Sequence, residues 1–183
     1  MGKLFSELDD DLREFIARQH LFFVATAPLA ADGHVNLSPK GLDTFRILGP
    51  TRIAYLDLTG SGVETIAHLR ENGRITILFC AFEGRPRIVR LYGRGYTVEP
   101  TDAEWPTVAA GFPALSGVRS VIVMDVDRIA DSCGYAVPRY EFVGDRPQLL
   151  DWADKKGAEG LLAYQAQKNR TSIDGLPGLP STD

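Results

Sequence analysis

Cysteine and histidine are scarce in this chain of 183 residues, which has two cysteines and three histidines. Cys80 and Cys133 lie far apart and form no Cys-x-x-Cys pair. A disulfide framework is therefore not indicated, and a reducing cytoplasm is the expected compartment. His20, His34 and His68 do not share the spacing of metal ligands, so we expect no metal site.

Long apolar runs and basic charge are also lacking. No run approaches the roughly 20 residues that a membrane-spanning helix needs, and the first twelve residues, MGKLFSELDDDL, lack the basic region and apolar core of a signal peptide. The net charge is −4 and the pI is near 5.4, which argues against a general nucleic-acid binder. We find no Gly-x-Gly-x-x-Gly motif, Walker motif, Ser-His-Asp set or paired-acid motif. An enzyme of this kind would need its chemistry from a cofactor.

The remaining composition is that of an ordinary globular protein. Hydrophobic residues make up 44% and charged residues 24% of the chain, which indicates a real core. We find no internal repeat and no clean domain boundary. We therefore expect a single domain over residues 1–183, with its core at about 10–130 and a C-terminal helical extension and tail at 131–183.

Apolar patterning predicts six or seven short strands with dispersed helices. Ser6 and Asp9 resemble a capping box before the first helix, and Thr101 and Glu104 resemble a second one. Gly93 and Gly95 suggest a bulge in a long strand. We predict strands at 21–27, 35–38, 52–57, 74–82, 87–98 and 118–126, and helices at 8–20, 63–71, 101–110, 147–157 and 158–169. Without regular βαβ alternation, this pattern favours an α+β fold, a Greek-key-like antiparallel barrel with peripheral helices.

One stretch, from Val35 to Glu71, combines a strand, a Lys-Gly loop, a second strand, a Gly-rich turn and a helix. Its helix start offers free N–H groups, to which Thr59 and Ser61 add hydroxyls and Lys40 a positive charge. Helix N-termini favour anions, so we predict a phosphate site here. The alternatives are a plain tight turn at residues 60–62 and a solvated loop charge at Lys40.

Three segments carry a resemblance to a known family: VNLSPKG, IAYLDLTGSG and RIVRLYGRG. Over about residues 10–130 the chain resembles the pyridoxamine 5′-phosphate oxidase-like family of FMN-binding split barrels. SCGYAVP and KNRTSIDGLPGL are similar to a subgroup described only as flavin-binding proteins of this family. The resemblance implies a homodimer with two flavin sites at the subunit interface.

The resemblance also implies a set of cofactor-binding residues. Lys40 corresponds to the lysine that contacts the FMN phosphate or the isoalloxazine edge, and the strand from Tyr55 to Asp57 passes beside the flavin. Asp57 either caps the helix or accepts a hydrogen bond from a ribityl hydroxyl. The expected set is Asn36, Ser38, Lys40, Tyr55, Asp57, Thr59, Gly60, Ser61 and Gly62; no catalytic residue is predicted.

The chain departs from true pyridoxamine phosphate oxidases in three ways. Ser61-Gly62 stands where they carry an Arg-Lys pair, Ile88 replaces a glutamine, and their C-terminal substrate signature is missing. Our hypothesis is therefore a cytoplasmic FMN-binding homodimer that transfers hydride or electrons to a small substrate other than pyridoxamine phosphate. The alternatives are a reductase of the same fold that uses the deazaflavin F420, or a non-catalytic flavin- or haem-binding or sensor protein.

Overall fold

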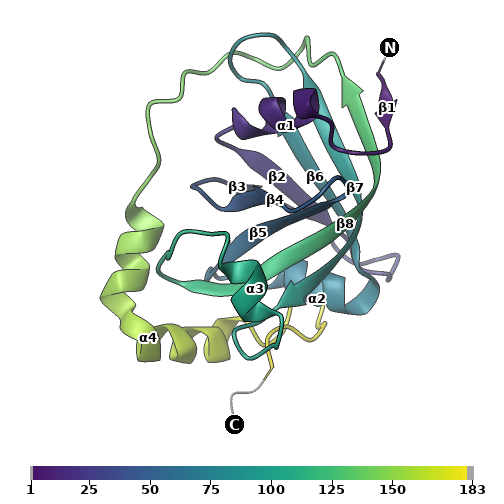
Figure 1. Cartoon of the computed structure of the whole chain (residues 1–183). Coiled ribbons are helices and arrows are strands. Elements are labelled where there is room, and N and C mark those ends of the chain that lie inside the picture. The colour runs from purple at the N-terminus through teal and green to yellow at the C-terminus, as the bar shows by residue number, and fades with distance from the viewer. Residues whose placement is uncertain (1, 181–183) are drawn as a thin grey trace.

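Strands dominate the structure, a computed structural model that describes residues 2–180 (Figure 1). Its elements in chain order are β1 (Leu4–Phe5), α1 (Asp10–Ala17), β2 (Phe22–Thr26), β3 (Asn36–Lys40), β4 (Phe45–Ile47), β5 (Arg52–Leu58), α2 (Glu64–Asn72), β6 (Arg74–Cys80), β7 (Ile88–Val98), α3 (Trp105–Ala109), β8 (Val118–Ser132) and α4 (Gln148–Lys168).

All strands join one antiparallel sheet in the order β3-β2-β6-β7-β8-β5-β4, and β1 pairs with β8. The sheet curls around itself, with α1 across one end and α2 at the other (Figure 1). The predicted α+β fold, an antiparallel split barrel with peripheral helices, is thereby confirmed. The sheet has eight strands instead of six or seven, since the short β1 and β4 carry too few residues to show a pattern.

The neighbouring strands β5 and β8 are buried on both faces over most of their paired length, because a core lies on each side of the sheet there. Ile53 and Tyr55 of β5 face the main core, into which α1 also packs, whereas Ala54 and Leu56 face a smaller core beside α3. Successive side chains of a strand point to opposite faces. Residue 57 of β5 therefore faces the inside of the curled sheet, as Ile53 and Tyr55 do.

The irregularity predicted at Gly93 is confirmed, although the extra residue of the bulge belongs to the neighbouring strand β8 and not to β7. The register of β7 against β8 shifts between Tyr92 and Gly93, so that Asp127 on β8 has no partner opposite it. A Cβ atom added at Gly93 would collide with the carbonyl oxygen of Asp125. Gly93 is thus required by a close approach of two backbones, which is one reason for glycine inside a strand.

Several element ends differ from the sequence-based expectation. Asp9, not Ser6, is the N-cap of α1, and its carboxylate accepts a hydrogen bond from the amide of Leu12 at 2.9 Å. Pro39 does not end its strand but lies within β3. Proline is tolerated there because β3 is an edge strand with one unpaired side. Thr101 does not cap α3, which begins at Trp105.

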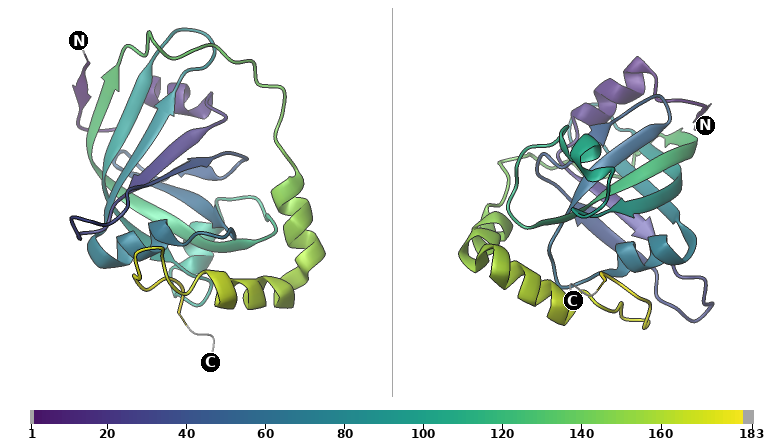
Figure 2. Two further views of the ribbon diagram at one scale, coloured as in Figure 1. Left: turned by 180° about the vertical axis from the view of Figure 1, so that it is seen from behind. Right: turned by 60° about the horizontal axis from the view of Figure 1, so that its bottom comes forward.

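The last third of the chain leaves the sheet after β8. Residues 133–147 run as an extended segment to α4, which stands beside the sheet and is broken by Gly157 at φ 65° (Figure 1). The tail after α4 then returns along α2 (Figure 2). Within this tail, Leu179 is buried and Ile173 is exposed. Among residues 2–180, no helix is both long and apolar enough to cross a membrane.

The close approach at Gly93 gives a stability prediction. Gly93→Ala should lower the free energy of unfolding by about 1–3 kcal/mol, the usual range for overpacking, because β7 or β8 must shift to relieve the collision. Gly111→Ala is the matched control, since a Cβ there meets no atom within 4 Å. Urea unfolding of the two variants measures the difference. Equal stabilities would contradict this account of the bulge.

Candidate functional site

A cavity of about 140 Å³ opens where the ends of β3 and β5 meet the start of α2. Its lining residues come from four neighbouring elements and the loop before α2. They are Asn36, Ser38, Lys40, Asp57, Leu58, Gly60, Gly62, Glu64, Thr65 and Arg119. The structure therefore brings together six of the nine residues predicted from the sequence: Asn36, Ser38, Lys40, Asp57, Gly60 and Gly62.

The carboxylate of Asp57 lies at the centre of this site and is fully buried. Its Oδ2 atom accepts a hydrogen bond from Nε of Arg119 at 2.7 Å, and its Oδ1 atom lies 3.5 Å from Nζ of Lys40. Ser120 Oγ lies 3.4 Å from Oδ2. Asp57 is thus neither the cap of α2 nor exposed to solvent, and its charge is shared between two cations from different strands.

A second bulge aims Arg119 at Asp57. The register of β5 against β8 passes from Asp57 opposite Ser120 to Leu58 opposite Val118, so Arg119 is the extra residue. Strict alternation would place Arg119 on the other face, with Val121 and Val123. Because a bulge re-aims a side chain, the guanidinium reaches the inner face instead.

The electrostatics of Asp57 follow from these contacts. Burial alone would raise the pKa of the Asp57 carboxyl, but Arg119 and Lys40 outweigh it and lower this pKa below the usual value. The Arg119 side chain is 5% exposed, and its Nη1 atom has no hydrogen-bond partner within the described part of the chain. A buried guanidinium donor without a partner leaves binding capacity for an acceptor in the cavity.

A chain of hydrogen bonds forms the opposite wall. Ser38 Oγ donates to Asn36 Oδ1 at 3.0 Å, and Asn36 Nδ2 donates to the hydroxyls of Thr26 at 3.1 Å and Thr65 at 3.0 Å. Thr26 Oγ1 lies 2.9 Å from Nδ1 of His68, whose pKa is lowered by burial. Since the single proton of Ser38 is already donated, this hydroxyl offers only acceptor lone pairs to the cavity.

Glu64 brings a second carboxylate to the site. A Cβ atom at Gly62 would collide with Oε2 of Glu64, so this carboxylate lies against the start of α2. Its Oε1 atom accepts a hydrogen bond from the amide of Ile173 at 3.3 Å. The two carboxylates of the lining balance the two cations, Lys40 and Arg119. An anion would therefore be held by directed donors and not by an excess of positive charge.

Three predicted residues do not line the cavity. Tyr55 is fully buried in the core, with its ring 5.5 Å from that of Phe22, and burial keeps the pKa of its hydroxyl well above the usual value. Thr59 Oγ1 accepts a hydrogen bond from Gln165 Nε2 at 2.8 Å. Ser61 is exposed. The sequence-based reasoning in turn missed four lining residues, Leu58, Glu64, Thr65 and Arg119. A charged residue at the start of an apolar strand was the one available signal for Arg119.

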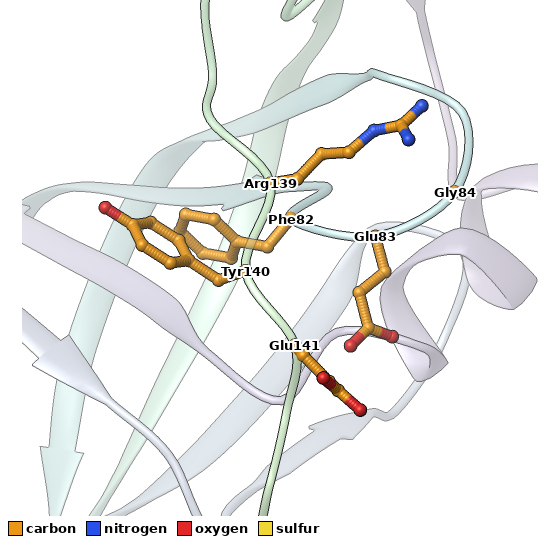
Figure 3. A pocket seen from close by; sticks show the side chains of 6 residues that line it. All are labelled: Phe82, Glu83, Gly84, Arg139, Tyr140 and Glu141. Carbon is orange, nitrogen blue, oxygen red and sulfur yellow. The ribbon is translucent and has the colours of Figure 1, made fainter.

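A wider depression of about 370 Å³ lies elsewhere, between the β6–β7 turn and the extended segment (Figure 3). It is lined by Phe82, Glu83, Gly84, Arg139, Tyr140 and Glu141. The rings of Phe82 and Tyr140 lie side by side, with centroids 5.4 Å apart. All of these residues except Phe82 are exposed. The smaller cavity, with its buried charges, is therefore the better candidate for chemistry.

The buried charges give a second stability prediction. Asp57→Ala should destabilise the fold by about 3–5 kcal/mol, because it leaves the guanidinium of Arg119 buried without its partner. Asp57→Asn, which keeps an acceptor oxygen, should cost less. Asp127→Ala, at an exposed position, is the matched control and should stay within about 0.5 kcal/mol of the wild type. Chemical denaturation checks the order; an Asp57→Ala protein as stable as this control would contradict it.

A pH dependence follows from the contact between the β2–β3 loop and the tail. Asp174 accepts hydrogen bonds from the amide of His34 and from its Nδ1 atom, both at 2.7 Å. This contact raises the pKa of His34 above 6.5 and lowers that of Asp174 below 3.8. The stabilisation by His34 is therefore complete below pH 6.5 and is lost as the pH rises through its raised pKa. The stabilisation by Asp174 is present above pH 3.8 and is lost as the pH falls through the lowered pKa of this carboxyl.

NMR titration of the His34 ring checks this prediction. The pKa should lie above 6.5 in the wild type and fall back toward 6.5 in Asp174→Asn. The melting temperatures of the two proteins should differ most between about pH 4 and 6.5, where both groups are charged. Unchanged titration of His34 in Asp174→Asn would show that the tail does not hold this loop in solution.

The family is shown by comparison with known proteins. The sequence pattern of the family described as Pyridoxamine 5′-phosphate oxidase matches residues 8–133. The Pyridoxamine 5′-phosphate oxidase family protein ustO of Aspergillus flavus is 42% identical over 198 residues, which cover 99% of this chain and 79% of ustO.

Two solved structures share the fold. HupZ from Group A Streptococcus aligns with a TM-score of 0.52 and 24% identity, over 66% of this chain and 90% of that one. A Lactobacillus delbrueckii protein described as a candidate pyridoxamine 5′-phosphate oxidase aligns with a TM-score of 0.53 and 18% identity, over 68% of this chain and 94% of that one. With the curled antiparallel sheet and the family match in agreement, this chain belongs to the pyridoxamine 5′-phosphate oxidase family.

Proposed function

We propose that this chain is an FMN-binding flavoprotein that holds the FMN phosphate in the 140 Å³ cavity and transfers hydride or electrons to a small substrate. The observation that carries the proposal is Arg119, which lines the cavity and whose buried Nη1 atom has no hydrogen-bond partner among residues 2–180. A phosphate oxygen would supply the missing acceptor, and Lys40, which also lines the cavity, would donate a second, charge-assisted hydrogen bond.

The size and polarity of the cavity suit one end of a flavin nucleotide. Its volume takes a phosphate-sized group and leaves the isoalloxazine ring outside. The lone pairs of Ser38 can accept a hydrogen bond from a ribityl hydroxyl next to the phosphate. A deprotonated phosphate oxygen has no proton to donate and could not make this contact. A ring outside the cavity agrees with the homodimer that the family resemblance implies, in which the flavin lies between two subunits. We propose a cytoplasmic homodimer on this basis.

The protein's own part in the reaction is to bind and orient. The bound flavin ring would supply the redox chemistry by accepting and donating hydride. Lys40 and Arg119 would fix the phosphate end, and Ser38 and Asn36 would fix the chain that links the phosphate to the ring. Asp57 keeps both cations in place but also cancels part of their charge, so binding should be weaker than in relatives with an Arg-Lys pair at positions 61 and 62. Because this chain lacks those two basic residues, we do not propose that it oxidises pyridoxamine phosphate.

Purification after reconstitution with FMN tests the proposal. We expect a yellow protein with a flavin absorbance spectrum after gel filtration, one flavin for each chain, and the mass of a dimer by light scattering. A colourless product would overturn the proposal.

Titration with F420 beside FMN decides between the two cofactors, because tighter binding of F420 would assign the cavity to a deazaflavin. A flavin that stays oxidised in the presence of both NADH and NADPH would favour a binding or sensor role.

The role of Lys40 gives a sharper prediction. Lys40→Ala should weaken FMN binding by about tenfold to a hundredfold, the usual value of a charge-assisted hydrogen bond, and leave the affinity for riboflavin nearly unchanged. Lys155→Ala, an exposed lysine on α4, is the matched control and should change neither affinity. Quenching of flavin fluorescence measures both. Equal losses for FMN and riboflavin would remove Lys40 from the phosphate site.

A further inference from the structure

The end of α4 reaches the loop that leads into α2. Asn169, directly after the helix, is fully buried, and its amide donates to Gln165 O at 2.8 Å. Its side-chain Nδ2 atom donates to the carbonyl oxygen of Gly60 at 2.9 Å and lies 3.5 Å from that of Ser61. The first distance is that of a firm hydrogen bond, and the second is at the limit for one.

These carbonyl contacts determine where the loop amides point. In a planar trans peptide the C=O of one residue and the N–H of the next point in opposite directions, and no peptide bond described here is cis. With Gly60 O held toward Asn169, the N–H of Ser61 points away from α4. Because Ser61 O also lies toward Asn169, the N–H of Gly62 points away from α4 as well. Gly62 is one of the residues that line the cavity. Among residues 2–180, these two amides donate to no acceptor.

The tail holds Asn169 firmly against the loop. The amide of Leu179 donates to Asn169 O at 2.7 Å, and Gly178 N donates to Arg170 O at 2.8 Å. A Cβ atom at Gly178 would lie 2.8 Å from both methyl carbons of Val63, so the tail backbone touches the residue before α2. Arg70 of α2 also donates to the Gly178 carbonyl. Figure 2 shows the tail beside α2 in both views.

The C-terminal extension therefore acts on the part of the site where this chain lacks cations. Residues 165–179 lie outside the stretch of 8–133 that matches the family. The start of α2 has no side-chain cap, so its N–H groups are free for an anion. Gln165 contributes a second side-chain hydrogen bond from α4 to the same loop, because its Nε2 atom donates to Thr59 Oγ1 at 2.8 Å.

We infer that Asn169 is a positioning residue, which turns the amides of Ser61 and Gly62 away from α4 so that these donors, beside the cavity that Gly60 and Gly62 line, bind the anionic end of the ligand. Gln165 supports it through Thr59. Backbone donors thereby take the place that two basic side chains hold in the related oxidases. The identity of the anion as the FMN phosphate rests on the proposed function. The hydrogen bonds by which Gln165 and Asn169 fix the loop do not depend on it.

Three variants test the inference. Asn169→Ala removes the donor, and Asn169→Asp keeps the shape but sets a carboxylate against two carbonyl oxygens. Gln165→Ala is a milder change on a half-buried side chain and serves if the buried substitutions impair folding. Gln167→Ala, exposed on the same turn of α4, is the matched control. Melting curves of all four establish that each variant is folded.

Two measurements separate positioning from general destabilisation. In the protein without ligand, hydrogen exchange of a peptide covering residues 59–64 should be faster in Asn169→Ala and Asn169→Asp, modestly faster in Gln165→Ala and unchanged in Gln167→Ala. FMN affinity should fall by about five- to tenfold in Asn169→Ala, while riboflavin affinity stays within about twofold, because only the phosphate end uses the loop amides.

The outcomes distinguish this inference from the proposed function. Unchanged exchange at residues 59–64 in every variant would overturn the hold of α4 on the loop, whether or not any flavin binds. Faster exchange with equal losses of FMN and riboflavin would overturn the orienting role, because it would show a structural effect alone. A wild-type protein that binds no flavin would overturn the proposed function, and the exchange result would still decide whether Asn169 positions the loop.

Discussion

The buried carboxylate of Asp57 is the constraint on which the candidate site depends. An ionised group without contact to water is costly unless it is paired. Asp57 is paired twice, with Arg119 from β8 and Lys40 from β3. Its burial therefore requires that the ends of three strands keep a fixed arrangement, and this arrangement encloses the cavity. The pairing still leaves Nη1 of Arg119 without a partner in the described part of the chain, so the residue that pairs with Asp57 and lines the cavity retains an unused donor.

Much of the fold and part of the site could be predicted from the sequence because they depend on local patterns. The continuous apolar runs at 53–56 and 121–124 reflect strands that are buried between two cores, and Asn36, Lys40, Asp57 and Gly62 meet because they lie on neighbouring segments of one short stretch. The contact of Arg119 with Asp57 could not be predicted, although a charged residue at the start of an apolar strand was visible in the sequence. This residue is 62 positions from Asp57, and its direction depends on a bulge, which arises from the register between two strands and leaves no local pattern.

The residues that sequence reasoning placed at the loop show a second limit. Thr59 and Ser61 were chosen for their hydroxyls, since hydroxyls bind anions. In the structure the Thr59 hydroxyl already has a partner in Gln165, and Ser61 lies on the surface. A sequence shows which groups could bind a ligand, whereas only the packing shows which of them the protein has already used. The loop offers its backbone, whose direction is determined by Asn169, a residue 109 positions from Gly60.

The charge balance of the lining connects these features. Two carboxylates and two cations leave the cavity neutral as a whole, so attraction at a distance contributes little, and binding depends on donors that are already aimed when the ligand arrives. Preorganised donors reduce the entropy that binding costs. A neutral site of this kind must be rigid to be useful, whereas a site with excess positive charge can tolerate a looser loop. The long C-terminal extension, which packs its tail along α2 and holds the loop by its carbonyls, provides that rigidity.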